Sequence, residues 1–274
     1  MRNRIACLVL LAAACALAAP PAKIVLVAGR PSHAPGDHEH NAGMLLLEKC
    51  LRQNKGVEPV VVKSGWPQDN SVFEGARAII LFMDGGGRHP LILDDRLAKI
   101  GALIEKGAGL ACLHYAVEVP KDNGGPQLLE WIGGYYERPY SQNPINDLDV
   151  TQASPNHPIS RGWKSFHVKD EWYYRMRFRP DDSRVTPILT AMLPTNAPNR
   201  EIIAWATQRA GGGRGFGFTG GHYHTNWGVP EFRQLVVNAI LWTARLDVPR
   251  SGAKCAITPE DLKQNLDDKP ARKQ

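Results

Sequence analysis

Residues 109–116 read GLACLHYA, an uncharged apolar run that ends in a histidine and a tyrosine. A short run of this kind is typical of a buried strand in an α/β protein. The residue that follows such a strand lies beside the ligand-binding crevice. We therefore expect Cys112 to be buried and His114 to take the exposed corner of the turn. A thiol inside a strand behaves as a small hydrophobe, which argues against a cysteine nucleophile here.

Similar apolar runs alternate with helical patterns on both sides of this stretch. Strands are predicted at residues 23–28, 57–63, 76–84 and 109–114, and helices at 43–53, 94–107 and 230–245. This alternation predicts an α/β fold with an open parallel sheet and helices on both faces. Residues 120–200 are rich in proline, asparagine and aromatic residues, so we expect them to form a substrate-side elaboration with antiparallel strands. The parallel core is expected to resume with residues 201–207 and 214–221.

The chain begins with the pattern of an exported protein. Arg2 and Arg4 precede an apolar segment, and an Ala-Leu-Ala cleavage signal follows at residues 16–18. This pattern predicts a signal peptide over residues 1–19 and a secreted or periplasmic protein. Lipidation at Cys15 is the less favoured alternative. The remaining chain divides into one domain, residues 22–248, and a polar tail, residues 249–274.

Charge and cysteine content exclude several classes of protein. Three widely spaced cysteines, Cys50, Cys112 and Cys255, would remain after cleavage, and they do not form a disulfide framework. The formal net charge is +6, but the basic residues are scattered, so no nucleic-acid partner is expected. No second apolar stretch approaches membrane length, so no transmembrane span is expected.

Histidines concentrate in the loops where ligands of such sheets bind. Seven of the nine histidines lie in residues 29–41, 84–90, 114–119 and 220–227. Imidazole and carboxylate groups are ligands of zinc and similar divalent ions. We therefore predict a divalent metal bound by His33, His40, His114 and His222. His38 and His40 are two residues apart, so on an extended loop they would point to opposite sides. The alternative is a solvated polar loop that opens the next helix.

Two further segments contribute candidate site residues. Residues 84–90, DGGGRHP, lack the lysine and the spacing of nucleotide-binding loops, so no nucleotide cofactor is predicted. Asp84 at the strand end is expected to face the crevice and bind a substrate hydroxyl. Asp170 and Glu171 are adjacent on a predicted strand, so at most one of them faces the site. A glycosidase with paired carboxylates is therefore not established.

Five ordered motifs resemble a known family. They are GRPSHAPGDHEHNAG, DGGGRHP, GLACLHYA, RGWKSFHVKDEWYY and GFTGGHYHTNW, and the resemblance spans residues 22–245. The sequence resembles the trehalose-utilisation (ThuA-like) family, which is similar in fold to class I glutamine amidotransferases with a flavodoxin-like sheet. Those amidotransferases carry a cysteine at the strand elbow and a later His-x-Glu. Here the elbow falls at His114 and the later pair reads His222-Tyr223-His224, so glutaminase activity is not expected.

The resemblance implies a role in the use of disaccharides, including routes through 3-keto sugars. We therefore expect an exported enzyme that acts on a glycoside or keto-sugar by histidine acid/base or metal-assisted chemistry. The expected catalytic residues are His114, His222 and Glu171, and the expected substrate-binding residues are Asp84, Tyr115, Tyr173 and Trp227. A non-catalytic carbohydrate-binding protein is the main alternative, and a hydrolase based on Cys112 is a third.

Overall fold

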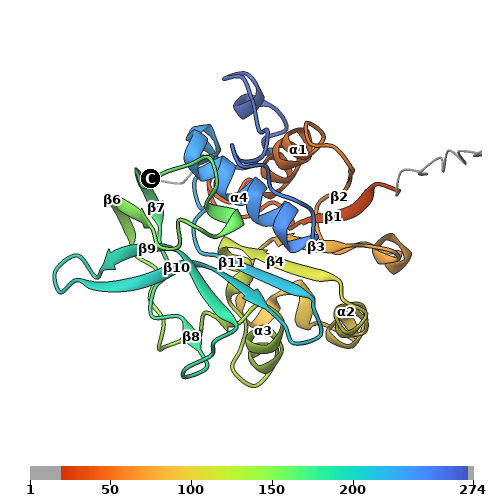
Figure 1. Ribbon diagram of the computed structural model, residues 1–274, viewed down its shortest axis with the longest axis horizontal. Coiled ribbons are helices and arrows are strands. Elements are labelled where there is room, and N and C mark those ends of the chain that lie inside the picture. Colours follow the sequence, from red (N-terminus) through yellow and green to blue (C-terminus); the bar gives the residue numbers. More distant parts are fainter. Residues whose placement is uncertain (1–19, 271–274) are drawn as a thin grey trace, which may run out of the picture.

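A nine-stranded mixed sheet forms the centre of the molecule in the computed structural model, which describes residues 20–270. The strand order is β2-β1-β3-β4-β11-β10-β9-β6-β7 (Figure 1). The signal peptide predicted at residues 1–19, with Cys15, lies outside the described residues.

One half of the sheet is parallel, as the aliphatic runs predicted. Its strands are β1 (Ala22–Ala28), β2 (Val57–Val62), β3 (Ala78–Phe82), β4 (Gly109–Leu113) and β11 (Arg214–Phe218). All four neighbouring pairs in the order β2-β1-β3-β4-β11 are parallel. This is the order of a flavodoxin-like sheet, so the predicted fold class is confirmed.

The other half of the sheet is antiparallel. It contains β10 (Asn199–Gln208), β9 (Val185–Leu193), β6 (Ile145–Gln152) and β7 (Phe166–Glu171), while β5 (Gly134–Tyr135) and β8 (Arg177–Phe178) pair separately. The prediction that residues 201–207 rejoin the parallel core is wrong, because β10 pairs antiparallel with β11. Only residues 209–213 join these two strands, and a parallel connection needs about a dozen residues or more.

Helices cover both faces of the sheet. Alternate side chains of β4 pack against the helices on opposite faces. The helices are α1 (His40–Leu51), α2 (Arg96–Glu105), α3 (Gly125–Trp131) and α4 (Pro230–Thr243). Ala111 and Leu113 belong to the core cluster that contains the apolar residues of α1 and α4. Leu110 and Cys112 belong to the opposite cluster, with those of α2 and α3. Cys112 is fully buried, and burial raises the pKa of its thiol, so the buried position expected for Cys112 is confirmed.

The segment after α4 returns across the molecule to α1. Gln53 Nε2 donates to the carbonyl oxygen of Ala256 at 2.8 Å, and Lys49 Nζ lies 2.5 Å from Asp261 Oδ1. The polar segment predicted as a tail therefore packs along the domain as far as it is described.

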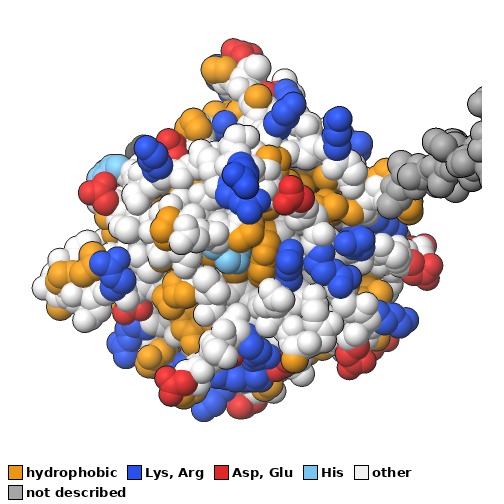
Figure 2. All heavy atoms as spheres, viewed as in Figure 1, with side chains coloured by type: hydrophobic (Ala, Val, Ile, Leu, Met, Phe, Trp, Pro, Cys, Tyr) orange, Lys and Arg blue, Asp and Glu red, His pale blue; other side chains and the backbone are white. Residues whose placement is uncertain are grey.

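The surface carries mixed charge. Figure 2 shows Lys and Arg side chains spread over one face, with Asp and Glu between them. Within residues 20–270, no helix has the length and apolar character needed to cross a membrane.

The buried imidazole of His89 makes stability depend on pH. Its Nδ1 accepts from the Leu91 amide at 3.0 Å and its Nε2 donates to the Ala116 carbonyl at 3.0 Å, so no nitrogen is free for a second proton. Burial lowers the pKa of His89 to about 4. The unfolded chain therefore binds this proton first, and stability is lost as the pH falls below about 6.5.

We expect the free energy of unfolding to decrease between pH 7 and pH 5 by up to about 1.4 kcal/mol per pH unit for each such histidine. Urea denaturation of the wild type and of His89→Gln at both pH values measures this slope. In His89→Gln the free energy of unfolding should depend less steeply on pH, by up to about 1.4 kcal/mol per pH unit, because the proton taken up by His89 on unfolding is absent. Equal slopes in the two proteins would contradict this role for His89.

Candidate metal centre and active site

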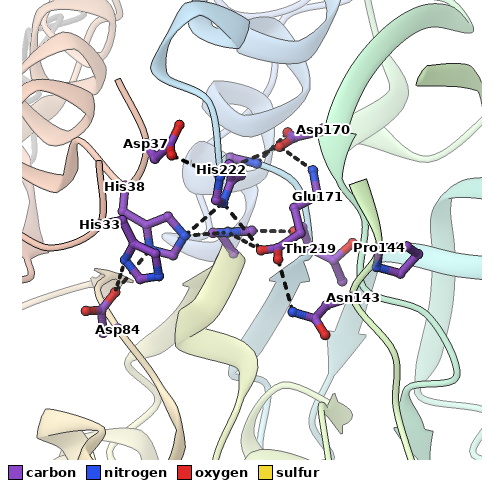
Figure 3. A network of polar contacts seen from close by, with 12 residues as sticks. His33, Asp37, His38, Asp84, Asn143, Pro144, Asp170, Glu171, Thr219 and His222 are labelled. Carbon is purple, nitrogen blue, oxygen red and sulfur yellow. Dashed lines mark hydrogen bonds and ion pairs between the residues drawn. The ribbon is translucent and has the colours of Figure 1, made fainter. Parts of the chain in front are cut away.

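Four side chains from distant parts of the chain meet beyond the carboxyl ends of the parallel strands. They are His38 from the loop after β1, His114 after β4, Glu171 at the end of β7 and His222 after β11. Figure 3 shows His38 beside His33 and Asp84, and His222 between Asp37 and the Asp170–Glu171 pair. Ligands are expected at this edge in open α/β sheets.

The ligand atoms of these four residues lie at distances that suit one small cation. His38 Nε2 is 3.0 Å from His222 Nδ1 and 3.1 Å from His114 Nε2. Glu171 Oε2 is 3.4 Å from both His114 Nε2 and His222 Nδ1. All four atoms lie within 4.8 Å of one another. Tetrahedral ligands bound at about 2.0–2.1 Å are separated by roughly 3.3–3.4 Å, close to the four N···N and N···O distances of 3.0–3.4 Å.

The outer nitrogens of two of these histidines fix where the lone pairs point. His114 Nδ1 lies 2.7 Å from the carbonyl oxygen of Thr219, which only accepts, so Nδ1 carries the hydrogen. His38 Nδ1 lies 3.0 Å from the Asp84 carboxylate and donates in the same way. In the neutral rings both Nε2 atoms therefore present lone pairs to each other and to Glu171. Such an arrangement requires a cation or an extra proton between them.

The register between β4 and β11 explains why His114 lies beside Thr219. Phe218 of β11 pairs with Leu113 of β4, so the next residues along the two strands, Thr219 and His114, lie side by side. His114 is at φ +52°, which turns the chain sharply as β4 ends.

The loop that carries His38 is joined directly to the loop that carries His222. The His38 amide donates to the His222 carbonyl at 2.8 Å, and the His224 amide donates to the Gly36 carbonyl at 2.9 Å. His38 itself is at φ +48°, so the loop bends instead of extending. This bend brings both His38 and His40 toward Asp84 despite their spacing.

The adjacent carboxylates Asp170 and Glu171 take different roles. Glu171 faces the histidines, whereas Asp170 is fully buried and accepts from the backbone amides of Gly221 at 2.7 Å and His222 at 3.0 Å. Asp170 thereby fixes the end of β7 to the loop after β11. The His222 Nε2 atom lies 3.6 Å from Asp37 Oδ2 on its outer side.

The electrostatic environment favours the metal-binding form of two groups. Burial lowers the pKa of His38 to about 2, so its ring is neutral near pH 7. Burial opposes ionisation of Glu171, but hydrogen bonds with His114 and His222 hold its pKa well below the ordinary value. Burial likewise works against a charged His222, yet Glu171 raises its pKa overall. The carboxylate of Glu171 therefore stabilises positive charge at the centre of the cluster.

Of the predicted metal ligands, His114 and His222 join the four-residue cluster, and His38 stands in it instead of His33 and His40. His33 stacks on His38 with ring centroids 3.6 Å apart, and it forms a smaller group with His38 and Asp84. His40 uses Nδ1 to donate to the Arg30 carbonyl at 3.1 Å, and its buried Nε2 lies 3.7 Å from Asp84. His114 does join the cluster, but it is fully buried and not at an exposed corner.

The predicted substrate-binding residues separate into two groups. Asp84 and Tyr115 line a cleft of about 850 Å³ beside the cluster. Tyr173 is buried, with its ring centroid 4.9 Å from that of His114, so it packs behind the histidine. Trp227 is 1% exposed and packs against Phe82 and Phe232. The expectation of a sugar-binding surface at Trp227 is corrected to a place in the core.

A buried ion pair from the C-terminal segment supports the His38 loop. Lys269 Nζ lies 3.1 Å from Glu39 Oε1 and donates to the carbonyl oxygen of Asp37 at 2.6 Å, with both charged side chains almost fully buried. The Asp267 amide donates to the other Glu39 oxygen at 2.8 Å. No local charge pattern indicates this contact, because Glu39 and Lys269 are far apart in the chain.

Comparison with known proteins identifies related sequences and folds. A family model described as trehalose utilisation (ThuA) matches residues 25–243. A putative ThuA-like protein from Parabacteroides merdae is 18% identical, with TM-score 0.62, covering 88% of this chain and 99% of that chain. Its counterpart from Bacteroides uniformis is 18% identical, with TM-score 0.61, covering 86% and 96%.

A more distant structure shares the fold over a smaller part of its own length. Agd3, described as a novel carbohydrate deacetylase, is 13% identical, with TM-score 0.51, covering 82% of this chain and 32% of that chain. At this identity the likeness concerns the fold. No curated protein matches the sequence significantly.

We expect Asp170→Asn to lower the free energy of unfolding by about 2–3 kcal/mol, because an amide cannot accept all the backbone hydrogen bonds that the carboxylate accepts. Asp149→Asn on the neighbouring strand β6 is the matched control, since Asp149 is 87% exposed. Urea denaturation compares the two variants. A loss no larger for Asp170→Asn than for Asp149→Asn would contradict the anchoring role.

Proposed function

The chain belongs to the ThuA family, and we propose from this and from the four-residue cluster that it is a carbohydrate-active enzyme with a metal-assisted mechanism. The proposed ion is zinc or a similar divalent cation, and the proposed substrate is a glycoside or a keto-sugar. Export from the cytoplasm is part of the proposal, on the basis of the pattern in residues 1–19.

The observation that carries the proposal is the convergence of three imidazole nitrogens and one carboxylate oxygen, all within 4.8 Å. The three histidines are almost fully buried, while the Glu171 side chain retains 16% exposure. A buried set of facing lone pairs with neither a cation nor an extra proton would be destabilising, because nothing would offset the desolvation of the polar groups. A purely carbohydrate-binding protein would have no need for this arrangement.

A divalent ion bound here would polarise a carbonyl or hydroxyl oxygen of the sugar. His38 and His114 have their outer nitrogens engaged with Asp84 and Thr219, so their role is to hold and orient. Glu171 is the most exposed of the four, and Asn143 Nδ2 donates to its second oxygen at 3.0 Å. We assign Glu171 the transfer of a proton to or from the substrate, while the three histidines would hold the ion and leave its fourth position to a substrate oxygen.

Metal content tests the binding part of this proposal. We expect purified protein, dialysed and reloaded with Zn²⁺, to bind one ion at the cluster and to lose it in His114→Ala, because a buried ligand is removed. Elemental analysis by mass spectrometry measures the ratio of metal to protein. His167→Gln is the matched control, since His167 is 58% exposed on β7.

Retention of the ion by His114→Ala, or failure of the wild type to take up any ion, would contradict the metal centre. If the wild type also binds sugar without turning it over, the carbohydrate-binding alternative is favoured.

Glu171→Gln separates proton transfer from metal binding. We expect this variant to keep the ion on the three histidines while kcat falls by about 100-fold or more, because the amide cannot accept a proton. Turnover of a panel of glycosides and 3-keto-glycosides by metal-loaded wild type and variant measures the effect, again with His167→Gln as control. Full activity in Glu171→Gln would contradict the proton-transfer role.

A further inference from the structure

The cleft beside the metal centre is lined by an excess of arginines. It measures about 850 Å³ and opens beyond β1 and β3, between the loop at Gly29–Pro31, the glycine-rich loop at Gly85–Gly87 and Arg138. Four arginines and two carboxylates line it: Arg30, Arg88, Arg96, Arg138, Asp84 and Glu118. A cleft of this volume lies within the usual range for small-molecule sites, roughly 300–1,000 Å³.

Two of the arginines are already neutralised by acidic side chains. Arg138 Nε lies 2.9 Å from Glu118 Oε1, and Arg96 Nη2 lies 3.1 Å from Asp94 Oδ2. The Asp84 carboxylate is engaged on the opposite side of the cleft wall by His38 Nδ1 at 3.0 Å. The carboxylates that line the cleft are therefore committed to other partners.

Arg30 and Arg88 are exposed and differ from the other two arginines. Across the described part of the chain, neither guanidinium forms an ion pair or a side-chain hydrogen bond with another residue. Two positive charges therefore face the cleft without a protein counterion.

The backbone at both arginines is held in place. The Arg30 carbonyl accepts from His40, and the Arg30 side chain lies over Gly65, where an added Cβ would come within 3.3 Å of Arg30 Cγ. Gly65 is at φ +120°, a conformation that favours glycine. Arg88 precedes the buried His89, whose two ring nitrogens are both hydrogen-bonded. These contacts fix the backbone positions from which the Arg30 and Arg88 side chains extend into the cleft.

The cleft is continuous with the wall of the metal centre. His33 and Asp84 line the cleft, and both contact or approach the ring of His38. Tyr115 also lines it, with its ring centroid 5.9 Å from that of His38. A ligand in the cleft would therefore extend from the arginines toward the cluster.

From this juxtaposition we propose that the substrate of the metal centre carries an anionic group, a carboxylate or a phosphate, bound by Arg30 and Arg88. Guanidinium groups pair with these oxyanions through two parallel hydrogen bonds and select them over neutral hydroxyls. The inference rests on the proposed function for the choice of a sugar as substrate. It narrows the substrate class to sugar acids or sugar phosphates.

Calorimetric titration of the purified protein, without chelation or other metal removal, tests this proposal with three probes: D-glucose, D-glucuronate and D-glucose 6-phosphate. We expect at least one anionic probe to bind about 10-fold or more tightly than glucose. Arg30→Gln/Arg88→Gln should abolish that preference, because the guanidinium contacts are removed. Arg52→Gln is the matched control, since Arg52 is 59% exposed on α1 and pairs with Glu48. The stronger of the two anionic probes distinguishes carboxylate from phosphate.

Equal binding of all three probes, or a preference that survives in the double variant, would overturn the proposal. Both results are independent of the metal measurement. A protein that binds zinc but shows no preference for anions keeps the proposed function and loses this inference. A protein that prefers anions but binds no metal keeps the anion site at Arg30 and Arg88 and loses the proposed metal-assisted function.

Discussion

The site depends on the direction of the imidazole lone pairs. The Thr219 carbonyl and the Asp84 carboxylate can only accept hydrogen bonds, so in their neutral forms His114 and His38 present the lone pairs of Nε2 to the interior of the cluster. Those two nitrogens are 3.1 Å apart, and the Glu171 carboxylate is close by. Neutral rings in this arrangement repel unless a cation or an extra proton lies between them, and we propose that a divalent metal ion is that cation.

The rest of the fold holds these directions fixed. The register between β4 and β11 puts Thr219 beside His114. Asp170 ties the end of β7 to the His222 loop, and the buried pair of Lys269 and Glu39 supports the loop of His38. Ligands come from segments that are far apart in the sequence, so their geometry depends on tertiary contacts more than on any local motif. Such support is expected around metal-binding histidines.

The sequence predicted the parallel half of the sheet well, because buried parallel strands have uninterrupted aliphatic runs that local patterning reveals. It misplaced residues 201–207, since an apolar strand carries no mark of its direction and only the short glycine-rich turn after β10 indicates a hairpin. Within the site, His114 and His222 could be predicted because both follow parallel strands, whose carboxyl ends border the ligand-binding crevice.

The sequence does not single out His38 as a site residue, because on an extended loop His38 and His40 point to opposite sides. In the structure His38 is at φ +48°, which bends the loop, and Gly36 two residues before it is the available sign of that bend. Trp227 was misplaced for a different reason, since an aromatic residue near a loop fits a core and a sugar-binding surface equally well.

The most direct test of the metal centre is a crystal structure of zinc-loaded protein with anomalous diffraction measured on both sides of the zinc absorption edge. We expect one anomalous peak at about 2.0–2.2 Å from His38 Nε2, His114 Nε2 and His222 Nδ1, with Glu171 Oε2 in the fourth position or close to it. A peak bound elsewhere, or no peak within reach of the three histidines, would contradict it.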